Sequence, residues 1–207
     1  PRMWGGVTNP SELRRIADVA DKYHVPMVKV TGGQRIDLLG IKKEDLPGVW
    51  KDLDMPSGHA YGKSIRTVKT CVGSEFCRFG TQNWTQLGSD LEHDLLNMWS
   101  PHKVELAVSG CPRNCAEAGI KDVGIIGVDS GWELYIGGNG GIKTEAGEFF
   151  VKVKTAEDVM EYSLAFLQLY REEAFYLERT VHYMQRVGMD HIKKGVLENA
   201  EQRKALH

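Results

Sequence analysis

Four cysteines, set in two close pairs, constrain the fold of this chain more than any other feature of its sequence. Cys71 and Cys77 stand in a C-x5-C spacing, and Cys111 and Cys115 stand in a C-x3-C spacing. Thiolates grouped in this way are typical of a metal centre that takes ligands from both pairs. We therefore expect the fold to bring two distant segments of the chain to one place.

The residues around the cysteines favour an iron–sulfur cluster. Pro112 can begin a helix directly after Cys111, and such a helix would place Cys111 and Cys115 on one face of its first turn. The positive end of a helix favours the negative charge of thiolates and sulfides. Gly73 and Gly80 let the backbone approach a cluster closely. Four thiolates from two segments are suited to a four-iron cluster.

Three other interpretations of the cysteines stay open at this point. Structural zinc is usually held by pairs with two to four intervening residues, which the C-x5-C spacing does not match. Two disulfides fit the cysteine count, although a bond between Cys111 and Cys115 would strain a helical turn. Inert buried thiols are also common. Because no export signal is visible and the cysteines are few, we expect a reducing cytoplasm in which the thiols stay free.

Composition and charge narrow the function classes. The chain has 207 residues, of which 42% are hydrophobic, so it can bury a core. Its net charge of −2 gives no electrostatic signature of nucleic-acid binding. No apolar run approaches the roughly 20 residues of a membrane helix. The chain starts at Pro1 with neither an initiator methionine nor a signal peptide, and we expect it to be a piece of a longer protein.

The first third of the sequence predicts a helix, a hairpin and a second helix. Asn9 can cap the first helix, and Pro10 is suited to its first position. Helical periodicity places Trp50 on the apolar stripe of the second helix, where we expect it in the core. The predicted elements are a helix from Pro10, strands over 25–30 and 34–41, a helix over 46–53 and a loop over 55–63.

The rest of the sequence alternates strands with helices and ends in helices. Thr155, with Asp158 three residues later, predicts a capped long helix, and Gly188 should break the helices that follow. This mixture of hairpins and segregated helices predicts an α+β fold. The predicted elements are a helix within 82–99, a strand over 104–108, a short helix after Cys111, strands over 123–128, 132–136 and 149–153, a glycine-rich loop over 137–141, and a helix over 155–171.

Both cysteine segments resemble the motifs of one enzyme family. Residues 67–82, TVKTCVGSEFCRFGTQ, resemble the first cluster motif of the sirohaem-containing nitrite and sulfite reductases, and residues 107–118, AVSGCPRNCAEA, resemble the second. The resemblance covers nearly the whole chain and is strongest to the C-terminal catalytic part of the large subunit of assimilatory NAD(P)H nitrite reductases. It implies a ferredoxin-like half domain over 1–60, a sirohaem and [4Fe-4S] binding domain over 61–154, and a C-terminal helical extension over 155–207.

The resemblance implies a coupled pair of cofactors, with Cys115 bridging a [4Fe-4S] cluster and the iron of a sirohaem. The reaction would be the six-electron reduction of nitrite to ammonium. A sulfite reductase module, which forms sulfide with the same cofactors, is the nearest alternative. Glu105 stands where sulfite reductases often carry a base, which favours nitrite. A zinc-stabilised interaction module without catalysis is the alternative of another class.

Several polar residues acquire expected roles from the same resemblance. Each base among them could also be a solvated surface charge. We expect Arg35, Arg66 and Lys103 to bind the substrate anion and support catalysis. We expect Arg78, Arg113, Asn114 and Asn139 to contact the sirohaem or the cluster.

The resemblance also implies partners. Stand-alone members of the family contain two copies of this module, whereas this chain has one, so missing bases would come from a homodimer partner or from sequence absent here. The chain has no G-x-G-x-x-G fingerprint, so FAD and NAD(P)H would bind in flavin and nicotinamide domains outside it. A small subunit is a further expected partner, while nucleic acid and membrane are not expected.

Overall fold

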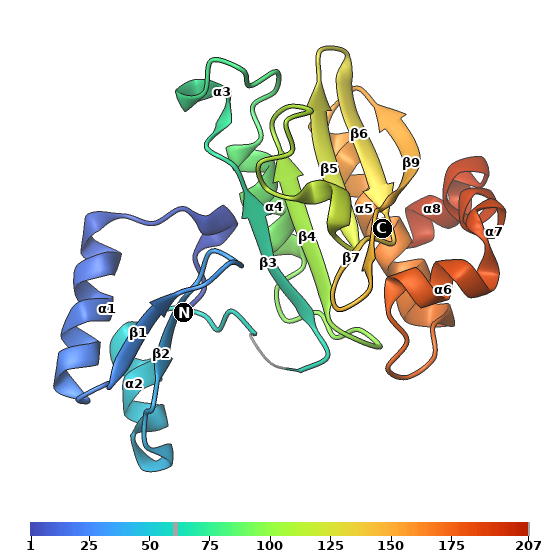
Figure 1. Ribbon diagram of the computed structural model, residues 1–207. Helices are drawn as coiled ribbons and strands as arrows, with labels where there is room; N and C mark the ends of the chain where they lie inside the picture. The colour runs from blue at the N-terminus through green and yellow to red at the C-terminus, as the bar shows by residue number, and fades with distance from the viewer. Residues whose placement is uncertain (60–61, 207) are drawn as a thin grey trace.

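The computed structural model describes residues 1–59 and 62–206 and shows two units side by side (Figure 1). The predicted order of helix, hairpin and helix in the N-terminal unit is confirmed, although both strands are shorter than expected. The predicted boundary between the first two domains, at residues 60 and 61, lies outside the described residues, as does residue 207. The N-terminal unit contains a 3-10 helix (Trp4–Gly6), α1 (Pro10–Lys22), β1 (Met27–Val30), β2 (Ile36–Leu39), a 3-10 helix (Lys43–Asp45) and α2 (Leu46–Leu53).

Local sequence explains how the N-terminal unit forms. The side-chain oxygen of Asn9 accepts hydrogen bonds from two amides of the first turn of α1, each at 3.0 Å, which confirms the predicted cap. Ile16 of α1 packs with Val49 and Leu53 of α2 in a small apolar core. Trp50 is 41% exposed, so the expectation that it lies in the core is wrong. The buried stripe of this short helix runs through Val49 and Leu53, and Trp50 lies beside it.

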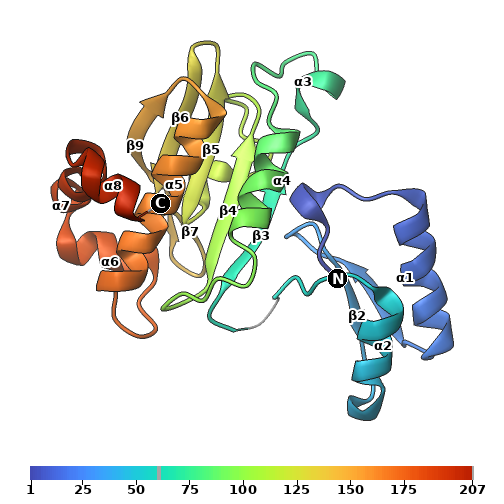
Figure 2. The same cartoon turned by 180° about the vertical axis from the view of Figure 1, so that it is seen from behind.

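A mixed five-stranded sheet forms the larger unit, in the order β3-β4-β5-β6-β9. β3, β4 and β5 are parallel to one another, whereas β6 is antiparallel to both of its neighbours, β5 and β9. The helices α4 and α5 cover one face of this sheet (Figure 2). The elements of this unit are β3 (Ile65–Thr70), α3 (Gly73–Phe76), α4 (Thr85–Asp94), β4 (Val104–Ser109), a 3-10 helix (Ala118–Ile120), β5 (Val123–Val128), β6 (Gly131–Ile136), β7 (Asn139–Gly140), β8 (Thr144–Glu145), β9 (Glu148–Val153) and α5 (Ala156–Glu173).

The chain ends in a group of helices packed beside α5. Thr155 and Asp158 form the predicted capping box at the start of α5, and the predicted break at Gly188 is present, with a positive φ of 84°. The helices that follow α5 are α6 (Thr180–Val187), α7 (Met189–Lys193), a π-helix (Lys194–Glu198) and α8 (Ala200–Leu206). Within 1–59 and 62–206, none of the helices combines the length and apolar content that crossing a membrane requires.

A buried ion pair joins the two units. The guanidinium of Arg2 donates to a carboxylate oxygen of Glu92 on α4 at 2.8 Å, and their side chains are 1% and 0% exposed. The other carboxylate oxygen of Glu92 accepts from the amides of Gly5 at 2.8 Å and Val68 at 3.1 Å. One carboxylate therefore ties the first residues of the chain to β3 and α4. Burial raises the pKa of Glu92, and the hydrogen bond from Gly5 and the charge of Arg2 oppose that rise.

Candidate functional site

The four cysteines lie around one cavity of about 610 Å³ at one end of the large sheet. Cys71 directly follows β3, and Cys111 follows the neighbouring strand β4 after a single glycine. These strands are parallel, so their carboxyl ends meet and bring the two pairs together, as the sequence predicted. All four thiols are free, with Cys111 buried and Cys115 exposed.

The segment that carries the second pair is a series of turns, and the prediction of a helix after Cys111 is wrong. The amide of Asn114 donates to the carbonyl of Cys111 at 3.1 Å, and the amide of Glu117 donates to the carbonyl of Asn114 at 2.9 Å. Asn114 and Glu117 have positive φ angles of 56° and 60°, so each ends a turn instead of continuing a helix. The short helix α3 lies between Cys71 and Cys77, in the segment that carries the first pair.

The lining of the cysteine cavity fits an iron–sulfur cluster. The amide of Gly110 donates to the sulfur of Cys71 at 3.3 Å, as amides do to cluster ligands. The buried indole N–H of Trp84, which lines the same cavity, has no hydrogen-bond partner among the described residues. Phe76 is 80% exposed beside the thiols, although it is a large apolar residue. Donors, thiolates and apolar surface therefore surround a space that exceeds the size of one ion.

A single metal ion is a poorer match to this arrangement. Among residues 1–59 and 62–206, no three His, Cys, Asp or Glu side chains converge closely enough to hold one metal ion. Zinc requires four ligands within bonding distance of one atom. Thiols spread around a cavity of about 610 Å³ match a multi-atom cluster better.

Two of the predicted arginines stack on one exposed aromatic ring next to the cysteines. The guanidinium carbon of Arg113 lies 3.6 Å from the ring centroid of Phe79, and that of Arg78 lies 4.6 Å from it. Arg113 lines the cysteine cavity, whereas Arg78 is exposed outside it. Cation–π contacts of this kind hold both guanidinium groups in place while leaving their N–H groups able to donate.

A second, smaller pocket of about 230 Å³ lies beside the cysteine cavity and is rich in charge. Gln34 pairs with the backbone of Thr70, donating to its carbonyl at 2.7 Å and accepting from its amide at 2.8 Å. Both residues line the cysteine cavity, and their neighbours Arg35 and Lys69 line the charged pocket. The charged side chains of this basic pocket are Arg35, Arg66, Lys69, Glu105, Glu117 and Lys121.

Ion pairs run along the basic pocket with alternating charge. Lys103 contacts Glu105 at 2.9 Å, and Glu105 contacts Lys121 at 3.5 Å. Lys121 contacts Glu117 at 3.7 Å, and Glu117 contacts Lys69 at 3.0 Å. Burial raises the pKa of Glu105, but the hydrogen bond from Lys103 and the nearby positive charges outweigh it, so the pKa lies below its ordinary value. The hydrogen bond from Lys69 likewise lowers the pKa of Glu117.

The structure places the three predicted anion-binding residues at or near this pocket. Arg35 lines it and donates to the hydroxyl of Thr67 at 3.1 Å. Arg66, on β3, also lines it and contacts the carbonyl of Gly62 at 3.4 Å. Lys103 lies outside the lining and contacts Glu105, which lines the pocket.

The two predicted asparagines lie in different places. The side-chain oxygen of Asn114 accepts from the hydroxyl of Ser109 at 3.3 Å and the amide of Gly119 at 3.2 Å, so it shapes the turn that carries Cys115. Asn139 lies in the small β7–β8 hairpin and donates to the carbonyl of Lys143 at 2.9 Å. That hairpin follows β6, at the end of the sheet opposite the cysteines.

Sequence reasoning missed Lys69, Lys121 and Glu117. The one available signal was position: Lys69 stands two residues before Cys71, and Lys121 directly precedes a buried aspartate and a strand. Neither position carries a motif, so only the register of the three parallel strands brings these side chains together.

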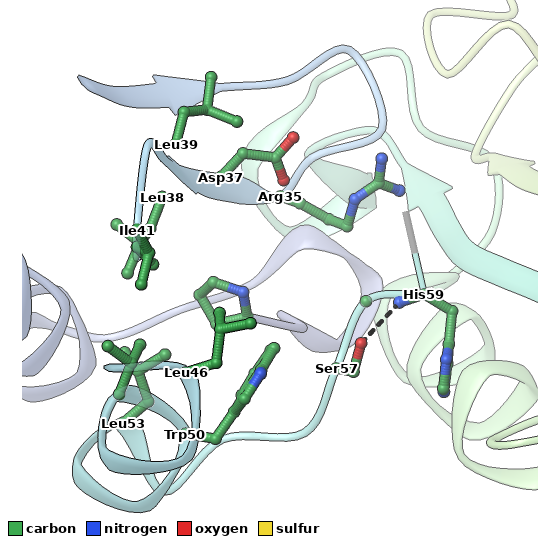
Figure 3. Close-up of a pocket in the computed structure, with 13 residues that line it drawn as sticks. Arg35, Asp37, Leu38, Leu39, Ile41, Leu46, Trp50, Leu53, Ser57 and His59 are labelled. Atoms are coloured by element: carbon green, nitrogen blue, oxygen red, sulfur yellow. Dashed lines mark hydrogen bonds between the residues drawn. The ribbon is translucent and has the colours of Figure 1, made fainter. Parts of the chain in front are cut away.

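A third pocket, of about 340 Å³, lies between β2 and α2 and is largely apolar (Figure 3). Leu38, Leu46 and Trp50 line it, and Arg35 extends along its edge toward the large sheet. His59 is at its rim, and its ring nitrogen contacts the side-chain oxygen of Asn97 at 2.9 Å. This pocket lacks the thiols and the clustered bases of the other two.

Comparison with known families and relatives agrees with this geometry. Residues 61–204 match the family described as nitrite and sulphite reductase 4Fe-4S domain, and residues 1–56 match the nitrite/sulfite reductase ferredoxin-like half domain. The first match supports an iron–sulfur cluster in this chain.

Individual relatives add detail. The chain is 62% identical, over all of its length, to a nitrite reductase [NAD(P)H] of Bacillus subtilis, but it spans only 26% of that protein. It is 32% identical over 95% of its length to an assimilatory-type sulfite reductase of Nitratidesulfovibrio vulgaris and covers 90% of that protein. A crystal structure of dissimilatory sulfite reductase I matches 91% of the chain and 66% of its own length, with a TM-score of 0.82 at 15% identity. That structural match confirms the predicted α+β fold.

Proposed function

The chain belongs to the nitrite and sulphite reductase family, and from this premise we propose that it is a catalytic module reducing nitrite to ammonium at a sirohaem coupled to a [4Fe-4S] cluster. One observation carries the proposal. Four free thiols from the ends of two parallel strands surround one cavity, and a pocket lined by four bases adjoins it. The 62% identity to a nitrite reductase supports nitrite as the substrate.

The thiolates of Cys71, Cys77, Cys111 and Cys115 would hold the cluster. Cys115 is the exposed member of the set, so its sulfur is the one best able to face a second group outside the cavity. Arg113 and Arg78 would pair with the sirohaem carboxylates, because both present guanidinium groups beside the cysteines. Asn114 supports the turn below Cys115.

Conversion of nitrite to ammonium takes up six electrons and eight protons and releases two water molecules. The two cofactors, when bound, supply the electrons and the iron at which nitrite is held. Arg35 and Arg66 would bind the nitrite oxygens and compensate their charge. Lys103 is 37% exposed and hydrogen-bonded to Glu105, so it would pass protons from solvent toward the pocket. We assign Asn139 no contact with the sirohaem or the cluster, because its β7–β8 hairpin lies at the end of the sheet opposite the cysteines.

Sulfite is the second candidate substrate, and one observation favours it. The assimilatory-type sulfite reductase relative is almost entirely covered by this single module. Parallel turnover assays with nitrite and sulfite would separate the two candidates. Faster reduction of sulfite at equal concentration would overturn the choice of nitrite.

An absorption spectrum and an iron count on protein purified without oxygen test the cofactors. We expect sirohaem bands and about five irons per chain, four in the cluster and one in the haem. Reconstitution with iron and sulfide should restore the cluster to a colourless sample. A protein that stays colourless and contains one zinc per chain would instead support a structural interaction module.

The donor and the assembly are further parts of the proposal. The Bacillus subtilis relative is about four times as long as this chain, which supports flavin and nicotinamide domains as the electron source. A small subunit and a second copy of this chain are the other proposed partners, and the second copy would add bases to the site. Free cysteines support a cytoplasmic location. Size measurement of the active protein tests the assembly, since an active, fully loaded monomer would exclude the homodimer.

A further inference from the structure

The basic pocket contains more positive charge than its own acids neutralise. Arg35, Arg66, Lys69 and Lys121 supply four positive charges, and two glutamates supply two negative ones, which leaves a net charge of +2. Its volume of about 230 Å³ is below the range of pockets that hold drug-sized molecules, so it admits a small anion and not a macrocycle.

Lys121 lies farther from the two acids of the basic pocket than their other lysine partners do. Its amino group donates a long hydrogen bond to Glu105 at 3.5 Å and lies 3.7 Å from Glu117. Each glutamate has a closer partner elsewhere: Lys103 at 2.9 Å from Glu105 and Lys69 at 3.0 Å from Glu117. The ammonium group of Lys121 therefore lies between two carboxylates, and its one recorded hydrogen bond to them, a long one, goes to Glu105.

The surroundings of Lys121 also fix its position. Its side chain is only 13% exposed and forms part of the lining of the basic pocket. The carbonyl of Lys121 accepts from the amide of Gly138 at 2.9 Å, and its amide donates to the carbonyl of Ala118 at 3.1 Å. A poorly hydrated ammonium group on an anchored backbone is a strong donor to an anion that enters the pocket.

We propose that Lys121 is an anion-binding residue of the active site and that Glu105 is the residue that positions it. Lys121 stands two residues before β5, and its amino group donates to the carboxylate of Glu105 at 3.5 Å. This inference rests on the proposed function, because nitrite is the anion in question. It explains how the pocket keeps its positive charge although position 105 is acidic.

Lysine labelling tests the contact without measuring activity. The holo-protein is treated with acetic anhydride with and without saturating nitrite, and the acetylation of each lysine is measured by mass spectrometry. We expect nitrite to slow acetylation of Lys121 and to leave Lys152 unchanged. Lys152 is a matched control, because it also faces a glutamate at 3.7 Å but lies outside the pocket. Equal acetylation of Lys121 in both samples would overturn the proposal.

Substitutions provide the second test. Lys121→Met should raise the KM for nitrite about tenfold, because it removes one charge-assisted hydrogen bond to the anion. The cluster and haem content should stay unchanged. Lys121→Arg should restore most of the affinity, and Glu105→Gln should raise KM while changing kcat less. Lys152→Met should behave as the wild type. A wild-type KM in Lys121→Met would refute the inference alone, whereas a wild-type protein that does not reduce nitrite would refute the proposed function.

Discussion

Replacing Arg2 by methionine should destabilise the protein strongly, because it leaves a buried carboxylate without its cation. Glu92 is fully buried, and after the substitution it retains only the amides of Gly5 and Val68 as partners. Removing one partner of a buried ion pair typically costs about 3–5 kcal/mol. For a chain of this size that corresponds to a fall in melting temperature of roughly 6–20 °C.

The double variant Arg2→Met/Glu92→Leu distinguishes the loss of the ion pair from the cost of leaving one buried charge unpaired. It removes both charges, so it should recover much of the stability lost in the single variant. Urea unfolding of the wild type, both single variants and the double variant gives the coupling free energy. A single variant within about 1 kcal/mol of the wild type would refute the idea that this pair joins the two units.

Three other predictions concern the cysteine cavity and the basic pocket. Cys115→Ser should lose the coupling between cluster and haem, and an unchanged haem spectrum in that variant would contradict the assignment. Gly110→Ala should cost about 1–3 kcal/mol and lower iron content, because a Cβ there would lie 2.2 Å from Trp84; thermal unfolding and an iron count check both effects. Glu117→Gln should reduce stability at neutral pH. The pKa of Glu117 is lower in the folded state than its ordinary value of 4.5. The stability difference between wild type and variant should therefore be present above pH 4.5 and vanish as the pH falls through the lowered pKa. Unfolding measured at several pH values checks this.

Much of the fold could be predicted because local sequence and tertiary structure agree. Asn9 and Thr155 cap the helices they were expected to cap, and β5 has the bounds that its apolar run predicted. The segment after Cys111 could not be predicted in this way. Proline after a cysteine permits a helix, but the left-handed backbone of Asn114 depends on bonds from Ser109 and Gly119 that form only in the folded chain.

The candidate site was predictable where a motif identified it and not where it depends on strand register. The cysteine spacing indicated a shared centre, and the structure places all four thiols around one cavity. The charged side chains of the basic pocket come from β3, β4, the segment before β5 and, in the case of Arg35, the hairpin of the N-terminal unit, and no sequence pattern links Lys69 to Lys121. Periodicity reports which face of an element is apolar, and it does not report which charged residues meet across neighbouring strands.

β3 is one of the two edge strands of the large sheet, and its free side would ordinarily be open to another chain. Here the amide of Val68 is bonded to Glu92, and the amide and carbonyl of Thr70 are bonded to Gln34. Two side chains thus take up the hydrogen-bonding groups that an incoming strand would need. The contacts that hold the N-terminal unit against β3 therefore also block edge-to-edge pairing with another chain. They do so at the end of β3, directly before Cys71.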